Sequence, residues 1–257
     1  MLPENQFPTQ LNQIAEIYAA LANGNTGEEL GFDVNSIIVT GESAGGNLAA
    51  ALCVKLALQN MEAECEAECE AECEAECEAE CDSDDATRED SSQPPPSTTA
   101  AEKPLDTDSD SIEPPPNHRM PDAIMLSCPA LNLTTELSHS RVIGTEDPVL
   151  PNALISAISE AYLPPGVDNK DSLVSPFYAP DEVLRRFPPA LLFASSKDPL
   201  LDDSVTFNER LRVLGVDSEL MAVHNVPHAY LGLGTAGFPE AVQVQQYAMD
   251  WMSSKLS

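Results

Sequence analysis

The stretch Ser36–Leu48, S-I-I-V-T-G-E-S-A-G-G-N-L, decides the fold class of this chain. Its first five residues are rich in β-branched side chains, which is typical of a buried strand. The segment that follows, Ala44–Gln59, has the apolar spacing of a helix. Between the two lies a G-x-S-x-G pattern around Ser43, which predicts a sharp strand-to-helix turn that exposes a serine hydroxyl. An incidental glycine-rich turn is the alternative interpretation of the same pattern.

Strand-like and helix-like segments alternate over the rest of the chain. The other short, mostly buried strands are expected at Ala123–Ser127, Ala190–Ser195 and Glu219–Val223. The other helical patterns cover Thr9–Ala22, Asn152–Tyr162, Asp203–Leu214 and Pro239–Ser254. Such alternation predicts an α/β fold with a mostly parallel sheet of about four strands flanked by helices. Ligands in these sheets bind at the carboxyl ends of the strands, so the chemistry is expected there.

The overall charge excludes whole classes of function. The chain has 257 residues, with 43 acidic residues against 12 lysines and arginines, and a net charge of −31. Nucleic acids and anionic membranes bind to basic patches, because lysine and arginine displace their condensed counterions. We therefore expect no nucleic-acid partner, and the composition also excludes a collagen or a small disulfide-rich domain.

The charge is concentrated in residues 62–119, which contain 20 acidic and three basic residues. Glu62–Cys81 repeats the tetrapeptide E-A-E-C five times, and we expect it to be a marginal helix that continues the preceding one. Residues 82–119 are mostly Asp, Ser, Thr and Pro, a composition that predicts disorder. We interpret residues 62–119 as a low-complexity insertion in one folded domain made of residues 1–61 and 120–257.

Cysteine usage and hydropathy bear on location and on metals. Five of the seven cysteines lie in the repeat, which is a poor disulfide framework, and no apolar stretch is long enough to span a membrane. No basic and apolar leader pattern opens the sequence, so we expect a cytoplasmic protein without an integral membrane segment. The repeat thiols could capture a soft metal, but a four-residue period winds by 40° per step on a helix and the thiols diverge. We expect no metal and no cofactor.

A serine nucleophile requires a base, and the chain offers four histidines. His118 lies in the insertion and His139 in a polar loop, so both are expected to be solvated. His224 directly ends a strand, whereas His228 follows Pro227 in the loop beyond it, from which a side chain can reach over the sheet. His228 is the favoured base and His224 the alternative.

The acid that orients the base is expected in the loop after the preceding strand. Asp198 comes directly after Ala190–Ser195, while Asp202 and Asp203 better suit the N-terminus of the next helix, where carboxylates cap free amides. The order Ser43, Asp198, His228 is the chain order expected for a nucleophile elbow on a sheet of this type.

Several motifs together resemble the hormone-sensitive lipase family of α/β-hydrolases. They are L-P-E-N-Q-F-P at the start, G-E-S-A-G-G-N-L (41–48), S-P-F-Y-A-P (175–180), D-P-L-L-D-D-S-V (198–205), N-E-R-L-R-V-L-G (208–215) and V-P-H-A-Y-L (226–231). The resemblance covers nearly everything outside the insertion. It implies a carboxylic ester hydrolase of the esterase or lipase type, with an acyl-enzyme on Ser43 and with Asp198 and His228 as its partners. A small-molecule or lipid ester is the implied substrate.

The chain departs from the family pattern at three places. Glu42 stands where the family usually has Asp, and His228-Ala229-Tyr230 stands where it has H-G-F. Family members also carry an H-G-G-G oxyanion loop ahead of P-E-x-x-F-P, and no His-Gly pair occurs here. Of the expected oxyanion donors only the N–H of Ala44 remains. We interpret the chain as the C-terminal portion of the fold, either a fragment of a longer enzyme or a short homologue, whose unpaired sheet edge could pair with a second copy.

Two other hypotheses stay open beside the esterase. The chain could be a non-catalytic ligand-binding homologue, or its E-A-E-C repeat could act as a metal or redox module. For the esterase, the region Leu131–Asp171 is expected to shape the acyl pocket, with Leu150, Leu154 and Tyr162 lining or covering it. Ordinary core packing is the alternative role of these three side chains.

Overall fold

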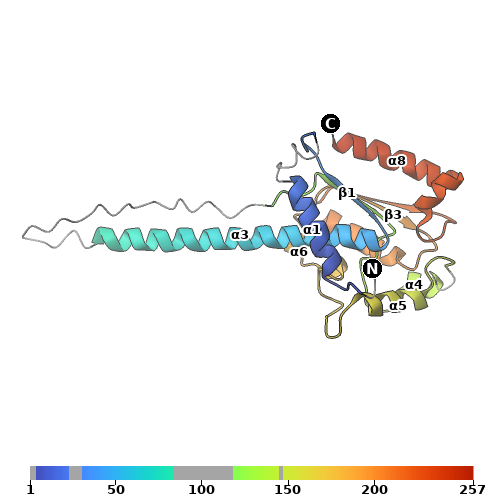
Figure 1. Ribbon diagram of the computed structural model, residues 1–257, viewed down its shortest axis with the longest axis horizontal. Coiled ribbons are helices and arrows are strands. Elements are labelled where there is room, and N and C mark those ends of the chain that lie inside the picture. The colour runs from blue at the N-terminus through green and yellow to red at the C-terminus, as the bar shows by residue number, and fades with distance from the viewer. Residues whose placement is uncertain (1–3, 23–30, 84–117, 145–146, 257) are drawn as a thin grey trace, which may run out of the picture. The chain divides into compact units, whose positions relative to one another are not determined.

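The computed structural model describes residues 4–22, 31–83, 118–144 and 147–256, with the side chains of residues 70–83 left out (Figure 1). The chain divides into two units, residues 1–59 with 118–257 and residues 60–117. The first unit holds the sheet together with Ser43, Asp198 and His228. The helix α3 (Ala44–Ser83) begins in the first unit and extends through the whole E-A-E-C repeat. The predicted disorder of residues 82–119 falls largely on residues 84–117, which lie outside the described part of the chain.

A parallel four-stranded sheet forms the centre of the first unit. Its strands are β1 (Ile38–Glu42), β2 (Ala123–Ser127), β3 (Ala190–Ser195) and β4 (Ser218–Val223), and they lie in the order in which they occur in the sequence. Every strand residue of β3 is buried, as expected of a strand covered on both faces. The predicted fold class, a parallel α/β sheet flanked by helices, is confirmed.

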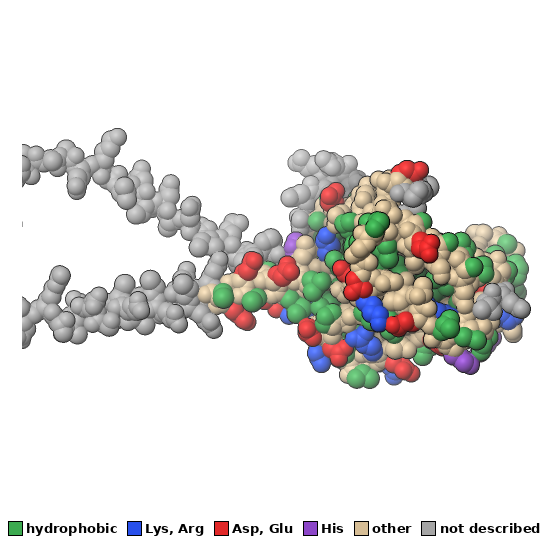
Figure 2. Space-filling view, turned by 90° about the horizontal axis from the view of Figure 1, so that it is seen from below, with side chains coloured by type: hydrophobic (Ala, Val, Ile, Leu, Met, Phe, Trp, Pro, Cys, Tyr) green, Lys and Arg blue, Asp and Glu red, His purple; other side chains and the backbone are tan. Residues whose placement is uncertain are grey.

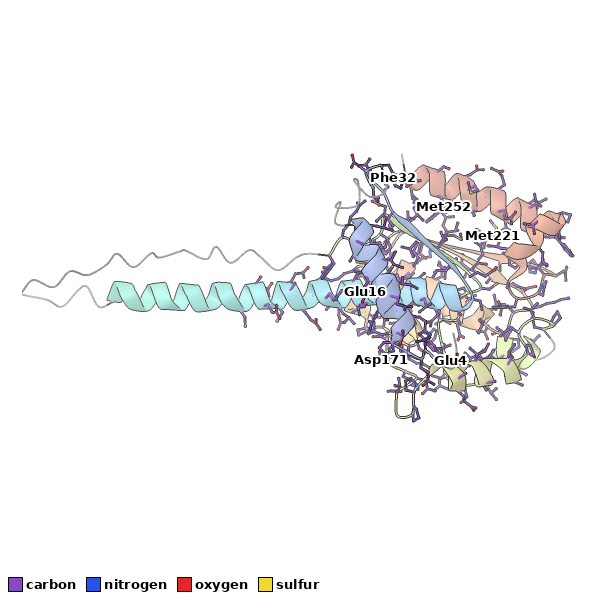
Figure 3. The ribbon with its side chains drawn as sticks, in the orientation of Figure 1. Glu4, Glu16, Phe32, Asp171, Met221 and Met252 are labelled. Carbon is purple, nitrogen blue, oxygen red and sulfur yellow. The ribbon has the colours of Figure 1, made fainter. Side chains whose placement is uncertain are left out.

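Helices cover both faces of the sheet (Figure 1). On one face α8 (Pro239–Lys255) packs on a cluster that includes Phe193 of β3 and Trp251. Met252 of α8 and Met221 of β4, both labelled in Figure 3, lie against this cluster. On the other face α1 (Thr9–Ala22) and the start of α3 form a second cluster. Successive strand residues point to opposite faces, so Ile38 joins the first cluster and Val39 the second.

The sequence pattern does not predict the short helical elements that lie between or after the strands. The expected helix at Asn152–Tyr162 is α5, and α7 (Leu201–Val213) follows β3. The unpredicted elements are α4 (His139–Ile143), η3 (Pro176–Tyr178), α6 (Asp181–Leu184) and η4 (Tyr230–Ala236). Segments of three to seven residues are too short for helical periodicity to appear in the sequence. His139, expected in a polar loop, is exposed but begins α4.

The surface of the first unit carries mixed charge. Figure 2 shows acidic and basic side chains interspersed on the face that it views, with apolar side chains between them. Among the described residues, no helix combines the length and the apolar character that crossing a bilayer requires.

Candidate active site

Ser43 lies on a tight turn between β1 and α3. Its φ of 56° falls in the left-handed region, which a residue with a Cβ rarely adopts. The turn is held by the N–H of Ser43, which donates to the carbonyl oxygen of Ser127 at 2.9 Å. Gly41 is required by the close approach of the chain, because a Cβ there would lie 2.2 Å from the carbonyl oxygen of Gly45. This is the strand-turn-helix geometry that the G-x-S-x-G pattern predicts.

The imidazole of His228 lies between the side chains of Ser43 and Asp198. Its Nε2 is 2.8 Å from Oγ of Ser43, and its Nδ1 is 2.8 Å from Oδ2 of Asp198. His228 is 3% exposed and Asp198 is 1% exposed. A carboxylate can only accept at Nδ1, so the ring carries its proton there and leaves the Nε2 lone pair free to accept from the serine hydroxyl. The structure thus brings together the three residues that the sequence analysis selected.

The loop after β3 fixes the carboxyl group of Asp198. Its Oδ1 accepts the N–H of Leu200 at 2.8 Å, while Oδ2 faces the histidine. Asp202 and Asp203 lie in the first turn of α7, as expected, but their carboxylates do not cap that helix. Asp202 accepts the N–H of Ser140 at 2.7 Å, and Asp203 forms a buried ion pair with Arg141 at 3.0 Å. Both bonds join the start of α7 to the segment that contains α4.

Cys128 lies beside the Asp198 carboxylate, a position that sequence reasoning did not single out. It follows β2 directly, is buried, and has a φ of 43°. Burial, and then the negative charge of Asp198, raise the pKa of the thiol well above its ordinary value, and Sγ lies within 4.8 Å of that carboxylate. Among the described residues, one cluster of His, Cys and acidic side chains has ligand atoms close enough together to hold a metal ion. It consists of Cys128, Asp198 and His228. Asp198 and His228 are hydrogen-bonded to each other. The arrangement therefore favours a thiol that supports the Asp198 carboxylate over one that binds a metal ion.

An apolar pocket of about 200 Å³ opens at Ser43 and Ala44. Leu150 and Tyr162 line it, as the sequence analysis expected, together with Leu48, Ala130, Leu133, Ile155, Ile158 and Leu200. Leu154 does not line the pocket and is 41% exposed, because it lies on the outward side of α5. Most of the wall comes from two segments, the start of α3 and residues 130–162 around α5.

The amide of Ala44 belongs to the first turn of α3. The first N–H groups of a helix have no acceptor within their helix and carry its partial positive charge. Ala44 also lines the pocket beside Ser43. Its N–H is therefore placed where an oxygen that becomes negative at the serine could be stabilised.

The remaining histidines lie away from this arrangement. His224 is exposed directly after β4, His139 is exposed at the start of α4, and His118 is half-buried. A further residue that sequence reasoning missed is Asp147, whose buried carboxylate accepts the backbone N–H of His228. The signal in the sequence was the Asp-Pro pair in a polar loop, which indicates a turn but not its contact with a histidine 81 positions away.

Comparisons with known proteins give a consistent result. A family model described as the alpha/beta hydrolase fold matches residues 1–78 and 100–232. An esterase of Gibberella moniliformis is 37% identical over 86 residues, which are 33% of this chain and 27% of the esterase. Hormone-sensitive lipase of Mus musculus is 47% identical over 64 residues, which are 25% of this chain and 8% of the lipase. These matches thus cover about a quarter or less of each relative's length.

Solved structures agree with the fold. An esterase of Pyrobaculum calidifontis superposes with a TM-score of 0.68 at 22% identity, covering 100% of this chain and 64% of the esterase. A hormone-sensitive lipase from a metagenome library superposes with a TM-score of 0.65 at 23% identity, covering 99% of this chain and 63% of the lipase. The resemblance to hormone-sensitive lipase, first drawn from sequence motifs, is confirmed.

Proposed function

Because the chain belongs to the α/β-hydrolase family, we propose that it is a serine hydrolase that cleaves carboxylic esters. One observation carries the proposal, the imidazole of His228 within 2.8 Å of both Oγ of Ser43 and Oδ2 of Asp198. A non-catalytic binding protein has no need of a base that is bonded to a nucleophile at one nitrogen and to a buried carboxylate at the other.

The proposed reaction has two stages that use the same histidine. Nε2 of His228 removes the hydroxyl proton of Ser43 while Oγ attacks the ester carbonyl carbon, and Asp198 stabilises the imidazolium that forms. The tetrahedral intermediate collapses, and His228 delivers the proton to the departing alcohol. A water molecule, deprotonated by His228, then attacks the acyl carbon. The bond between this carbon and Oγ breaks, His228 returns the proton to Oγ of Ser43, and the carboxylic acid departs.

The amide of Ala44 is proposed as an oxyanion donor. It follows the nucleophile directly and sits at the positive end of α3, where negative charge on the carbonyl oxygen develops in the transition state. One such donor is worth about 10²- to 10³-fold in rate.

The substrate proposal rests on the pocket next to Ser43. Its walls are mostly aliphatic, with Tyr162, Gln10 and Asn47 among them, which suits the acyl part of an ester. A small-molecule or lipid ester fits this chemistry. The relatives named esterase and hormone-sensitive lipase support the same class.

We also propose that residues 1–61 and 120–257 form the hydrolase domain and that residues 62–119 are an insertion. The family model skips residues 79–99, which supports an insertion in the middle of this range, while it matches residues 62–78 and 100–119. Pairing of two copies through an edge of the sheet stays a prediction, and the oligomeric state in solution is its test.

A fluorophosphonate probe tests the proposed nucleophile directly. It reacts with an activated serine and needs no knowledge of the natural ester. We expect stoichiometric labelling of Ser43, no labelling of a Ser43→Ala variant, and turnover of p-nitrophenyl acetate or butyrate. Equal labelling of the variant would refute the assignment of the nucleophile. A folded wild-type chain that neither reacts with the probe nor turns over these esters would favour a ligand-binding role.

A further inference from the structure

The carboxylate of Asp147 joins two parts of the site that are distant in sequence. Its Oδ2 accepts the backbone N–H of His228 at 2.9 Å. Its Oδ1 accepts the backbone N–H groups of Val149 and Leu150, each at 2.8 Å. The side chain is 5% exposed, so these hydrogen bonds form with little competition from water. All three donors are backbone amides, and a carboxylate is the side chain that can accept from all of them.

The two ends of this link matter to the proposed reaction in different ways. Leu150 is part of the pocket wall, and His228 carries the imidazole that contacts Ser43. The two neighbouring positions of the histidine loop with left-handed backbone, Asn225 (φ 62°) and Ala229 (φ 54°), show how sharply this loop is bent. A bent loop with such strain keeps its shape only where surrounding contacts hold it.

The segment that contains Asp147 is also fixed to the loop that contains Asp198. Oγ of Ser140 donates to the carbonyl oxygen of Pro199 at 2.9 Å. Gly144 packs so closely on the same loop that a Cβ there would lie 2.8 Å from the nitrogen of Pro199. The segment is therefore fixed to the loop that contains Asp198, and the carboxylate of Asp147 connects it to the loop that contains His228.

We propose that Asp147 is a positioning residue for His228. It holds the backbone of the histidine in the position from which Nε2 contacts Oγ of Ser43. This inference rests on the proposed function of Ser43 and His228. The carboxylate contacts the backbone of Leu150 but does not itself line the pocket, and in the described contacts it touches none of the reacting atoms, so it acts on the reaction through the histidine backbone. Hydrogen bonds to an ionised acceptor are about twice as strong as neutral ones, which suits a residue that must hold a strained loop.

Asparagine at this position keeps the size of the side chain but cannot accept hydrogen bonds from both His228 and the pair Val149 and Leu150. Its single carbonyl oxygen can accept from His228 or from Val149 and Leu150, and its amide group then points at a backbone donor on the other side. Asp147→Asn therefore breaks one side of the connection. The matched control is Asp168→Asn, because Asp168 is exposed and its Oδ1 accepts the N–H of Lys170 at 2.9 Å in a similar turn.

The experiment uses the full chain and two readouts. The first is the maximal rate of Ser43 labelling by a fluorophosphonate at saturating probe, and the second is amide hydrogen exchange at His228 followed by NMR. We expect Asp147→Asn to slow labelling at least tenfold and to speed exchange of the His228 amide at least tenfold. We expect Asp168→Asn to stay within twofold of the wild type in both.

Several outcomes would overturn the proposal. Labelling of Asp147→Asn within threefold of the wild-type rate would show that the contact does not position the base, and slower labelling with unchanged His228 exchange would show that Asp147 acts by another route. If the variant does not fold, the wild type alone decides, because a His228 amide that exchanges at the intrinsic rate of an unstructured amide would exclude a hold on this backbone. A wild type that is not labelled refutes the proposed function, whereas the exchange readout still reports on the Asp147 contact.

Discussion

Nε2 of His228 lies 2.8 Å from Oγ of Ser43, although the two residues are 185 positions apart in the chain. Ser43 follows β1 and His228 follows β4, and two strands lie between these in the sheet. All four strands are parallel, so both residues emerge at the same edge, where loops can cover the distance. Asp198, which follows β3, completes the group.

The carboxylate of Asp198 is expected to select the tautomer of His228. In Asp198→Asn, the N–H of Leu200 holds the carbonyl oxygen of the asparagine, and its amide group then faces Nδ1. The ring must accept there and place its proton on Nε2, where it can no longer take the serine proton. We expect turnover of p-nitrophenyl butyrate to fall by about 10³- to 10⁴-fold. Asp168→Asn, an exposed aspartate outside the site, is the control, and a loss below tenfold in Asp198→Asn would contradict this role.

The turn at Ser43 is expected to be disrupted by a side chain at Gly41 and to accommodate one at Gly45. In Gly41→Ala the new Cβ would lie 2.2 Å from backbone atoms of Gly45, so the turn must open. We expect a loss of unfolding free energy of about 1–3 kcal/mol or more, measured by urea denaturation, with loss of Ser43 labelling. In Gly45→Ala the Cβ meets nothing within 4 Å, and stability should hold. Equal stability of the two variants would contradict the close approach at Gly41.

The pocket wall is expected to set the length of acyl chain that is accepted. Leu150→Ala widens a pocket that holds about 200 Å³, and each additional methylene that it buries contributes about 0.8 kcal/mol. We therefore expect kcat/KM for p-nitrophenyl octanoate to rise about tenfold relative to that for the butyrate. Leu154→Ala changes a side chain outside the pocket and should leave the ratio unchanged. A shift of the same size in both variants would argue against Leu150 as a wall of the acyl site.

Alkaline pH is expected to destabilise the fold through Cys53. Complete burial raises the pKa of this thiol from 9.0 to about 12. Between these pH values the unfolded chain loses the proton while the folded chain keeps it, so the stability contributed by the neutral thiol is full below pH 9 and falls as pH rises. The loss is about 1.4 kcal/mol per pH unit for this group. Cys53→Ala should show a shallower decline of unfolding free energy from pH 9 to 11.

Cys65→Ala is the control for that measurement. Cys65 is exposed in the repeat, so its replacement should leave the wild-type dependence on pH. An equally steep decline in Cys53→Ala and the wild type would mean that other groups cause the alkaline loss. Tyr18 and Tyr162, whose pKa values burial raises to about 12, would then be the next candidates.

Sequence reasoning located the strands and the residues Ser43, Asp198 and His228 for a physical reason. Each of these residues follows a short apolar strand, and parallel strands end at a common edge, so position along the chain already implies proximity in space. The ranges Ala123–Ser127 and Ala190–Ser195 were predicted with the bounds that the structure has. Buried strands keep their pattern because both of their faces select apolar residues.

The contacts that support the site could not be predicted in the same way. Asp147 and Cys128 depend on loop geometry, since each side chain meets a partner whose loop follows a different strand. An Asp before Pro indicates a turn, and its bonds to Val149 and Leu150 follow from that local rule, but its bond to His228 does not. Likewise Leu154 has the right spacing for the pocket side of α5, yet the helix turns it outward.

The left-handed backbone of Ser43 has a consequence for the history of such a chain. Only glycine adopts that conformation without strain, so the substitution that destroys the proposed nucleophile, Ser43→Gly, would also relax the turn by about 1 kcal/mol. At this position the same substitution, Ser43→Gly, would raise the stability of the fold and remove the proposed activity. A serine that persists there through many generations is held by selection for chemistry, against the preference of the fold.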